Sequence, residues 1–259
     1  LVQTGHVDVM VSVGNNFFYT KSLPCSLWFF DKGKKEELRD KVLFIDARNY
    51  YTVVDRTLNE WSEWQLKNLN AIVWLYRGEK SKYKELLHEY LRYFRTVREY
   101  LIGKSAKRVF SAIDGIEDFE DLKDALLTEI EEERQDCKEK LAQAPKKERK
   151  SIQAFSDQYV ELLQNDLSIV EDALWLTEKF GEGQYADIPG LCKVATLEEI
   201  EARGYSLTPG AYVGVAPTED DGVDFHERMT EIHKELLSLQ AGSNRLMETI
   251  SKNWEEMGL

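Results

Sequence analysis

The hydrophobic pattern of this chain changes near residue 57, and this change restricts the folds it can adopt. Before residue 57 the apolar residues alternate with polar ones or form short runs, as β-strands do. From there to about residue 180 they recur every three or four positions, which is the period of an amphipathic α-helix. The pattern therefore predicts a mainly α protein with a small β portion.

Three short segments near the start predict strands, namely 6–13, 23–30 and 42–45. Pro24 must lie at the start or the edge of its strand, because proline has no N–H to donate to a neighbouring strand. No helical stretch separates the three segments. We therefore expect them to pair antiparallel.

The helical part has recognisable start and stop signals. Thr57 and Ser62 are alternative helix caps, since each is followed three residues later by Glu or Gln, and Gly78 can end the helix that follows. Pro145 separates two later helices. Residues 184–217 hold most of the later prolines, and we expect turns there with one short helix after Thr196.

The last segment predicts one long helix with a heptad pattern, in which apolar residues alternate in steps of four and three. Ser243 and Gly242 weaken the middle of this pattern. We expect the apolar side to contact a partner helix, although it could instead complete the core of this chain. The expected contact residues are Phe225, Met229, Ile232, Leu236, Leu239, Leu246 and Ile250.

Composition excludes several classes of protein. The formal net charge of −13 argues against unaided binding to bare nucleic acid. No apolar run approaches the ~20 residues of a membrane helix, and no basic-then-apolar signal opens the chain, so we expect no membrane contact. Three widely spaced cysteines without a CxxC pattern favour the reducing cytoplasm.

Sequence motifs for common chemistries are absent: there is no GxxxxGK[ST], GxGxxG, GxSxG or HExxH. His226 and His233 share a helix face, but without further ligands they predict a solvated surface and no metal site. Asp46 follows the third strand, with Arg48 beside it. A carboxylate there could be catalytic, but it is more often a turn or cap acceptor.

Residues 80–108 carry nine Lys or Arg and three Glu, with tyrosines between them. Such a surface could follow phosphates, and Arg92, Arg95 and Arg98 are the candidate contacts. The neighbouring residues 114–142 hold twelve acids and four bases. The simpler alternative is that these two segments pair with each other.

Residues 14–20, GNNFFYT, place three aromatic residues in a turn directly after a strand. They could form a stacking surface for a nucleic-acid base or another flat ligand. Alternatively, the loop could fold back on the core. Phe18 and Tyr19 are the candidate stacking residues.

Together the segments resemble a known family. GNNFFYTKSLPCSLWFFDKGK, then VLFIDAR, then YADIPGLCKVATLEEIEARGYSLTPGAYVG and DDGVDF before a long helix are similar to the methylation subunit of type I restriction–modification systems. The likeness covers about 1–78 and 184–259. Residues 79–183 resemble an insertion of longer members and match less well.

The resemblance implies an S-adenosylmethionine-dependent methyltransferase acting on the adenine amine of DNA, with the target base flipped out of the duplex. It implies partners as well: a specificity subunit, a second methylation subunit and restriction subunits, with DNA bound through the complex. The family's [N/D]PP[Y/F] catalytic turn and Gly-rich cofactor loop are missing. The chain also begins with Leu1, so we expect a C-terminal portion with no catalytic residue, no bound cofactor and no activity alone.

On that interpretation the first strands are the terminal strands of a Rossmann-like methyltransferase sheet, followed by a helical bundle and a long C-terminal helix. Two other interpretations remain open: an acidic helical adaptor without enzymatic ancestry, or a nucleic-acid module that uses the basic face 80–108. The expected segments are 1–50 for the strands, 51–78 for a connecting helix, 79–183 for the bundle of antiparallel helices, 184–217 for the turns and 218–259 for the long helix.

Overall fold

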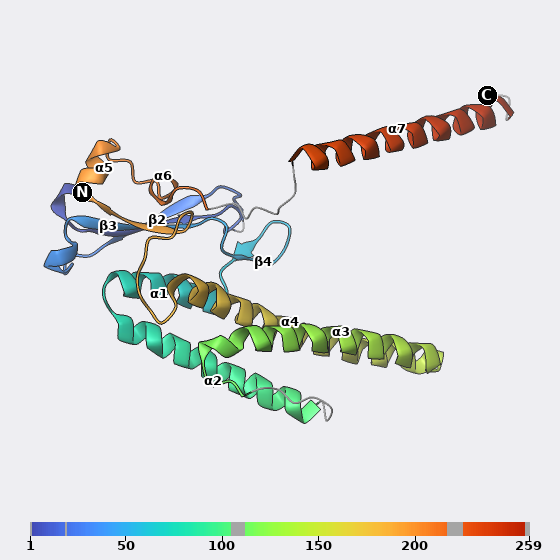
Figure 1. Ribbon diagram of the computed structural model, residues 1–259, viewed down its shortest axis with the longest axis horizontal. Coiled ribbons are helices and arrows are strands. Elements are labelled where there is room, and N and C mark those ends of the chain that lie inside the picture. Colours follow the sequence, from blue (N-terminus) through green and yellow to red (C-terminus); the bar gives the residue numbers. More distant parts are fainter. Residues whose placement is uncertain (1, 19, 105–111, 217–224, 257–259) are drawn as a thin grey trace. The chain divides into compact units, whose positions relative to one another are not determined.

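Figure 1 shows a computed structural model of the chain, which describes residues 2–18, 20–104, 112–216 and 225–256. The chain divides into two compact units, Leu1–Ala216 and Pro217–Leu259. Each unit is described by itself. The described residues are mostly helical with a small mixed sheet, in agreement with the expected fold class.

A four-stranded sheet forms the centre of the first unit. Its order is β2-β1-β3-β6, with β1 at Val7–Val13, β2 at Cys25–Phe30, β3 at Lys41–Ala47 and β6 at Cys192–Thr196. Strands β1 and β3 are buried on both faces, whereas β2 is an edge strand with exposed apolar side chains. Pro24 immediately precedes this edge strand, as expected.

The expectation of all-antiparallel pairing is wrong for one neighbour. Strand β1 pairs antiparallel with β2 but parallel with β3. The reason is the path of the chain: β2 ends opposite Val7, where β1 begins, and residues 31–40 then pass that end of β1 to enter β3 on its other side. A hydrogen bond from the Asp31 N–H to the His6 carbonyl (2.9 Å) fixes this crossing.

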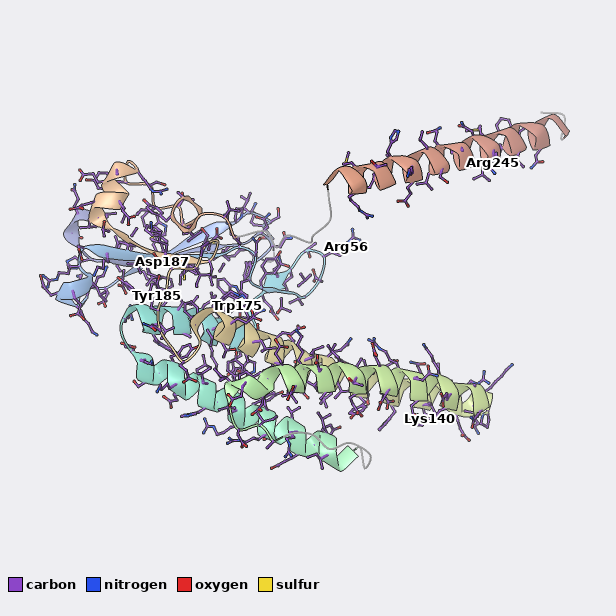
Figure 2. The ribbon with its side chains drawn as sticks, in the orientation of Figure 1. Arg56, Lys140, Trp175, Tyr185, Asp187 and Arg245 are labelled. Atoms are coloured by element: carbon purple, nitrogen blue, oxygen red, sulfur yellow. The ribbon has the colours of Figure 1, made fainter. Side chains whose placement is uncertain are left out.

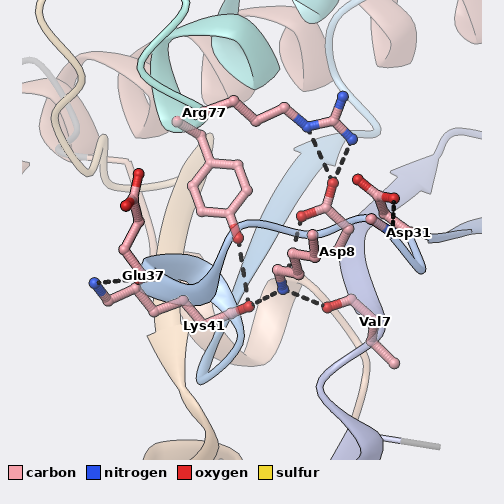
Figure 3. Close-up of polar contacts among 9 residues, drawn as sticks. Val7, Asp8, Asp31, Glu37, Lys41 and Arg77 are labelled. Atoms are coloured by element: carbon pink, nitrogen blue, oxygen red, sulfur yellow. Dashed lines mark hydrogen bonds and ion pairs between the residues drawn. The ribbon is translucent and has the colours of Figure 1, made fainter.

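A buried polar cluster holds the crossing in place (Figure 3). The Lys34 ammonium donates to the Val7 carbonyl at 2.7 Å and also to the Lys41 carbonyl, so it joins the starts of β1 and β3. It also lies 3.6 Å from the Asp8 carboxylate, which accepts from the Arg77 guanidinium. Burial lowers the pKa of Lys34, but the surrounding carboxylates oppose this effect. The paired charges explain how a lysine can sit in this core.

The fourth strand, β6, was not expected, because residues 184–217 were interpreted as turns with one short helix. Strand β6 pairs antiparallel with β3 and is followed directly by α5 at Leu197–Ala202, which Thr196 and Glu199 cap as expected. A further helical turn, α6, covers Gly210–Val213. The five-residue strand was missed because CKVAT is too short and too weakly apolar to stand out from its turns.

Helices cover both faces of the sheet (Figure 1). Val9, Val11 and Ile45 face the larger helical core, while Met10 and Phe44 face α5 and α6. The Phe44 ring stacks on Tyr212 of α6 with 3.9 Å between centroids. This alternation along each strand is the period of two that the sequence showed.

The larger core is made by four helices: α1 at Glu63–Tyr76, α2 at Lys80–Lys104, α3 at Phe119–Gln143 and α4 at Lys146–Phe180. Helices α3 and α4 lie along each other and extend away from the sheet. The apolar face expected for α2 is buried. On α4, the sequence pattern also favoured a buried face that includes Phe155 and Leu162, but these two are exposed and the adjacent Leu163 is buried.

The expected connecting helix occupies only the second half of its segment. Ser62 forms the capping box with Gln65 and starts α1, whereas the alternative cap Thr57 lies in a hairpin of β4 (Thr52–Val53) and β5 (Asn59–Glu60). Gly78 follows the helix with a φ of 75°, which suits a helix stop.

The second unit contains one long helix, α7, at Phe225–Glu256. This agrees with the single long helix expected from the heptad pattern. Among the described helices none is both long and apolar enough to cross a membrane.

Candidate functional site

The loop after β1 is the most sharply defined surface feature near the sheet. Gly14 lies so close to the end of β3 that a Cβ would be 2.8 Å from the Arg48 carbonyl oxygen. Asn16 has a φ of 62°, a left-handed conformation that Asn tolerates better than most residues. The loop therefore leaves β1 through a tight turn against the loop after β3.

The aromatic run divides between packing and exposure, and the predicted stacking of a base on it stays a prediction. Phe17 packs back on the core, with its ring 4.8 Å from Trp61 and 5.8 Å from Tyr51 between centroids. Phe18 is 49% exposed. Tyr19 lies outside the described residues. The loop is thus anchored by one ring and presents the next one to solvent.

The β4–β5 hairpin fastens the same loop through Asn59. The Asn59 side-chain amide donates to the Asn15 carbonyl (2.9 Å), and its backbone N–H donates to the Asn16 carbonyl (2.8 Å). Arg56 lies at the exposed tip of this hairpin (Figure 2). The loop 14–18 and the hairpin 52–60 therefore form one surface.

Behind this surface, Tyr50 connects the hairpin to the helices. Its carbonyl accepts from the Trp61 indole N–H at 2.7 Å, and its hydroxyl donates to the Asp172 carboxylate of α4 at 3.0 Å. Burial raises the pKa of Asp172 to about 6, against the opposing effect of hydrogen bonds from Tyr50 and Ser62. No local pattern could have indicated this pair, since its members are far apart in sequence.

Asp46 serves as a turn acceptor, as the commoner interpretation predicted. Its carboxylate accepts the Arg48 backbone N–H at 3.2 Å and binds the guanidinium twice, with Nε–Oδ1 at 2.8 Å and Nη2–Oδ2 at 2.6 Å. This hydrogen bonding raises the pKa of Arg48. Because Asp46 is fully engaged, it is poorly placed to act as a free base.

The three candidate arginines of α2 differ in their surroundings. Arg92 is exposed, Arg98 is half-buried, and Arg95 donates to the Ile113 carbonyl at 2.9 Å and lies 4.0 Å from Asp114. The contact between Arg95 and Asp114 is one point at which the basic segment 80–108 pairs with the acidic segment 114–142. Phosphate binding by these residues stays a prediction.

Three of the four tyrosines in the basic segment 80–108 are packed inside the molecule, whereas Tyr100 is 39% exposed beside Tyr159 of α4. Tyr83 and Tyr90 are completely buried, and Tyr93 is half-buried with its hydroxyl 2.6 Å from Asp166 of α4. Their periodicity follows the packed face of α2 because large rings fill the space between α1, α2 and α4. This finding weakens the interpretation of α2 as a module that stacks nucleic-acid bases.

The apolar seam of α7 is exposed along its described length. The side chain of Phe225 lies outside the described residues, as does that of His226. The described part of the chain contains no group of three or more His, Cys, Asp or Glu suited to a metal ion. The exposed seam residues are Met229, Ile232, Leu236, Leu239, Leu246 and Ile250.

Comparison with known proteins shows which family part of the chain is similar to. Residues 1–90 match a family described as N-6 DNA Methylase, and these residues include β1–β3, the aromatic loop and α1. This part of the chain is therefore similar to DNA methylases.

The resemblance to methylase subunits of type I restriction enzymes is confirmed by two relatives. The chain is 42% identical over 96 residues to the Type I restriction enzyme HindI methylase subunit of Haemophilus influenzae, covering 36% of this chain and 21% of that protein. It is 24% identical over 258 residues to the Type I restriction enzyme MjaIX methylase subunit of Methanocaldococcus jannaschii, covering 100% of this chain and 28% of that protein. The chain therefore spans about a quarter of the length of these relatives.

Proposed function

We propose that this chain belongs to an S-adenosylmethionine-dependent DNA methyltransferase that methylates the amino group of adenine, and that its aromatic loop supports the flipped target base. A base inside the duplex hides its amine, so such an enzyme must extrude the base and hold it. Phe18 is the residue we assign to that contact.

The observation that carries this proposal is the exposure of Phe18 on an otherwise anchored loop. The loop is fixed by Gly14, by Phe17 and by Asn59, which makes flexibility a poor explanation for an exposed ring. An aromatic ring on a fixed loop can stack on a base, with a gain of about 1–3 kcal/mol.

The cofactor does not fit the cavity beside the sheet. This cavity, of about 270 Å³, lies between the sheet and α1 and has a mostly apolar lining that includes Val9, Leu27 and Phe29. It contains no carboxylate to accept from an ammonium or ribose hydroxyl, and its Arg77 is engaged by Asp8. We therefore derive no step through the cofactor from this chain.

We infer that the sheet continues beyond β2 in the assembled methylase, as a Rossmann-like sheet of which these are terminal strands. Trp28, Phe29 and Phe30 are each about half exposed on this edge strand. Such an edge is a template for further strand pairing, and exposed rings beside it would be covered by the added layer.

We infer that the α7 seam packs on a helix of the specificity subunit, while a second methylation subunit and restriction subunits join the complex. A seam of six exposed apolar residues on one long helix favours a helical partner. DNA recognition is then assigned to the complex, which suits a chain with a net charge of −13.

The proposal is tested by Phe18→Ala in the methylase complex that contains this chain. We expect kcat/KM for DNA methylation to fall about ten- to hundredfold, because the stacking contact is lost, and the unfolding midpoint to stay unchanged. Phe18→Trp should retain most of the activity.

Phe155→Ala is the matched control, since Phe155 is an exposed ring on α4 far along the chain. It should leave methylation unchanged. Equal rates for Phe18→Ala and the unaltered complex would refute the assignment of Phe18.

A further inference from the structure

We propose that Asp172 of α4 is a positioning residue for the loop 14–18. Through this residue, α4 sets the position of the exposed Phe18 ring. The link to a target base rests on the proposed function. The link between α4 and the loop rests only on contacts within this chain.

The first step is the pair of contacts that α4 makes with the Tyr50 side chain. The hydroxyl of Tyr50 donates to Asp172, and its ring stacks on Trp175 with 4.0 Å between centroids and 12° between planes. Residues 172 and 175 are three apart on a helix and so share a face. Figure 2 labels Trp175 at the end of α4 nearer the sheet.

Helix α1 adds hydrogen bonds to the same two residues, Tyr50 and Asp172. The Asn68 side-chain amide donates to the Tyr50 hydroxyl at 2.9 Å and to the Asp172 carbonyl at 2.7 Å. The Ser62 hydroxyl donates to the second Asp172 carboxylate oxygen at 3.4 Å. The Asp172 carboxylate therefore accepts hydrogen bonds from Tyr50, which precedes the hairpin, and from Ser62, which caps α1.

The second step passes from Tyr50 to the loop. Its carbonyl holds the Trp61 indole, and Trp61 in turn packs on Phe17, the neighbour of Phe18. Three successive contacts thus connect a carboxylate of α4 to Phe17, the residue bonded to Phe18. Asp172 binds the Tyr50 side chain, and the Tyr50 carbonyl binds the Trp61 ring that packs on Phe17.

The structure offers a matched comparison in Asp166, a second buried carboxylate on α4. It accepts from the Tyr93 hydroxyl of α2 at 2.6 Å, and its exposed area is 6%, the same as that of Asp172. Loss of either carboxylate should destabilise the core similarly. Asp166 bonds to Tyr93 of α2, whereas Asp172 bonds to Tyr50.

The test is hydrogen exchange of the Trp61 indole N–H and the Asn59 backbone N–H, followed by NMR in the full chain. Asp172→Ala should accelerate both about tenfold, because the bond to Tyr50 is lost, whereas Asp166→Ala should leave them within about twofold. Asp172→Asn should restore slow exchange, because it keeps an acceptor oxygen for the Tyr50 hydroxyl.

Equal acceleration by the two alanine variants, or no acceleration by Asp172→Ala, would overturn the proposal. Methylation by the complex provides a second reading: Asp172→Ala should lower kcat/KM at least about tenfold more than Asp166→Ala does. If the unaltered complex methylates no DNA, the proposed function fails, while the exchange experiment still decides the coupling.

Discussion

The buried carboxylate of Asp172 makes the stability of the first unit depend on pH. Its folded-state pKa is raised to about 6 from an ordinary value of 3.8, so between these values the folded chain holds a proton that the unfolded chain has lost. The free energy of unfolding should therefore fall as pH rises from 4 to 7, by about 2–3 kcal/mol from this group.

Urea unfolding of the unaltered chain and Asp172→Asn at pH 4 and pH 7 isolates this effect, because Asn does not titrate. The unaltered chain should lose stability relative to the variant as pH rises. Groups near the carboxylate include Tyr50, Ser62, Gln65 and Glu171, of which only Glu171 adds a like charge. A stability difference that is the same at both pH values would contradict the assignment.

Single residues also show what sequence can and cannot reveal about this site. Phe18 was identifiable, because three aromatic residues after a strand and a Gly-Asn turn are a local pattern. Asp172 and Lys34 were not, because each is buried by partners that only the fold brings together. A charged residue in a helix or a loop predicts exposure until its partner is known.

At the level of elements, the start of α1 has an unusually large role. The Ser62 hydroxyl caps the helix by accepting the Gln65 N–H at 3.0 Å and also lies within reach of Asp172. Ser62→Ala should therefore lower the free energy of unfolding by about 1–2 kcal/mol, measured by urea denaturation.

The alternative cap gives the control for this prediction. Thr57 lies in the β4–β5 hairpin, and its hydroxyl donates to the exposed carboxylate of Asp55 at 2.9 Å, so Thr57→Ala should cost less than about 0.5 kcal/mol. A larger loss for Thr57→Ala than for Ser62→Ala would mean that the helix is capped elsewhere in solution.

The elements were predicted well where their pattern was long and poorly where it was short. The buried faces of α2 and α3 follow from periodicity alone, since each helix is long enough to repeat its apolar pattern over many turns. Strand β6 and the parallel pairing of β1 with β3 depend on a crossing connection and on a strand from distant sequence. Neither feature leaves a recognisable pattern in the residues next to it in the sequence.

For the whole molecule, the α7 seam is the feature that most requires a partner. The described seam residues are exposed, and the helix forms a unit separate from the sheet and its helices. A chain with a net charge of −13 would repel DNA phosphates. A partner subunit that binds the DNA would remove the need for this chain to contact the phosphates. Assembly and DNA methylation should therefore fail together when the seam is altered.

The combined substitution Leu236→Glu and Leu239→Glu should abolish co-purification with the specificity subunit, because it places two charges in an apolar contact. The helix content of the chain, measured by far-ultraviolet circular dichroism, should stay the same. Ser238→Glu with Ala241→Glu adds the same charge off the seam and should leave assembly intact. Normal assembly of the Leu236 and Leu239 variant would instead assign the seam to another partner.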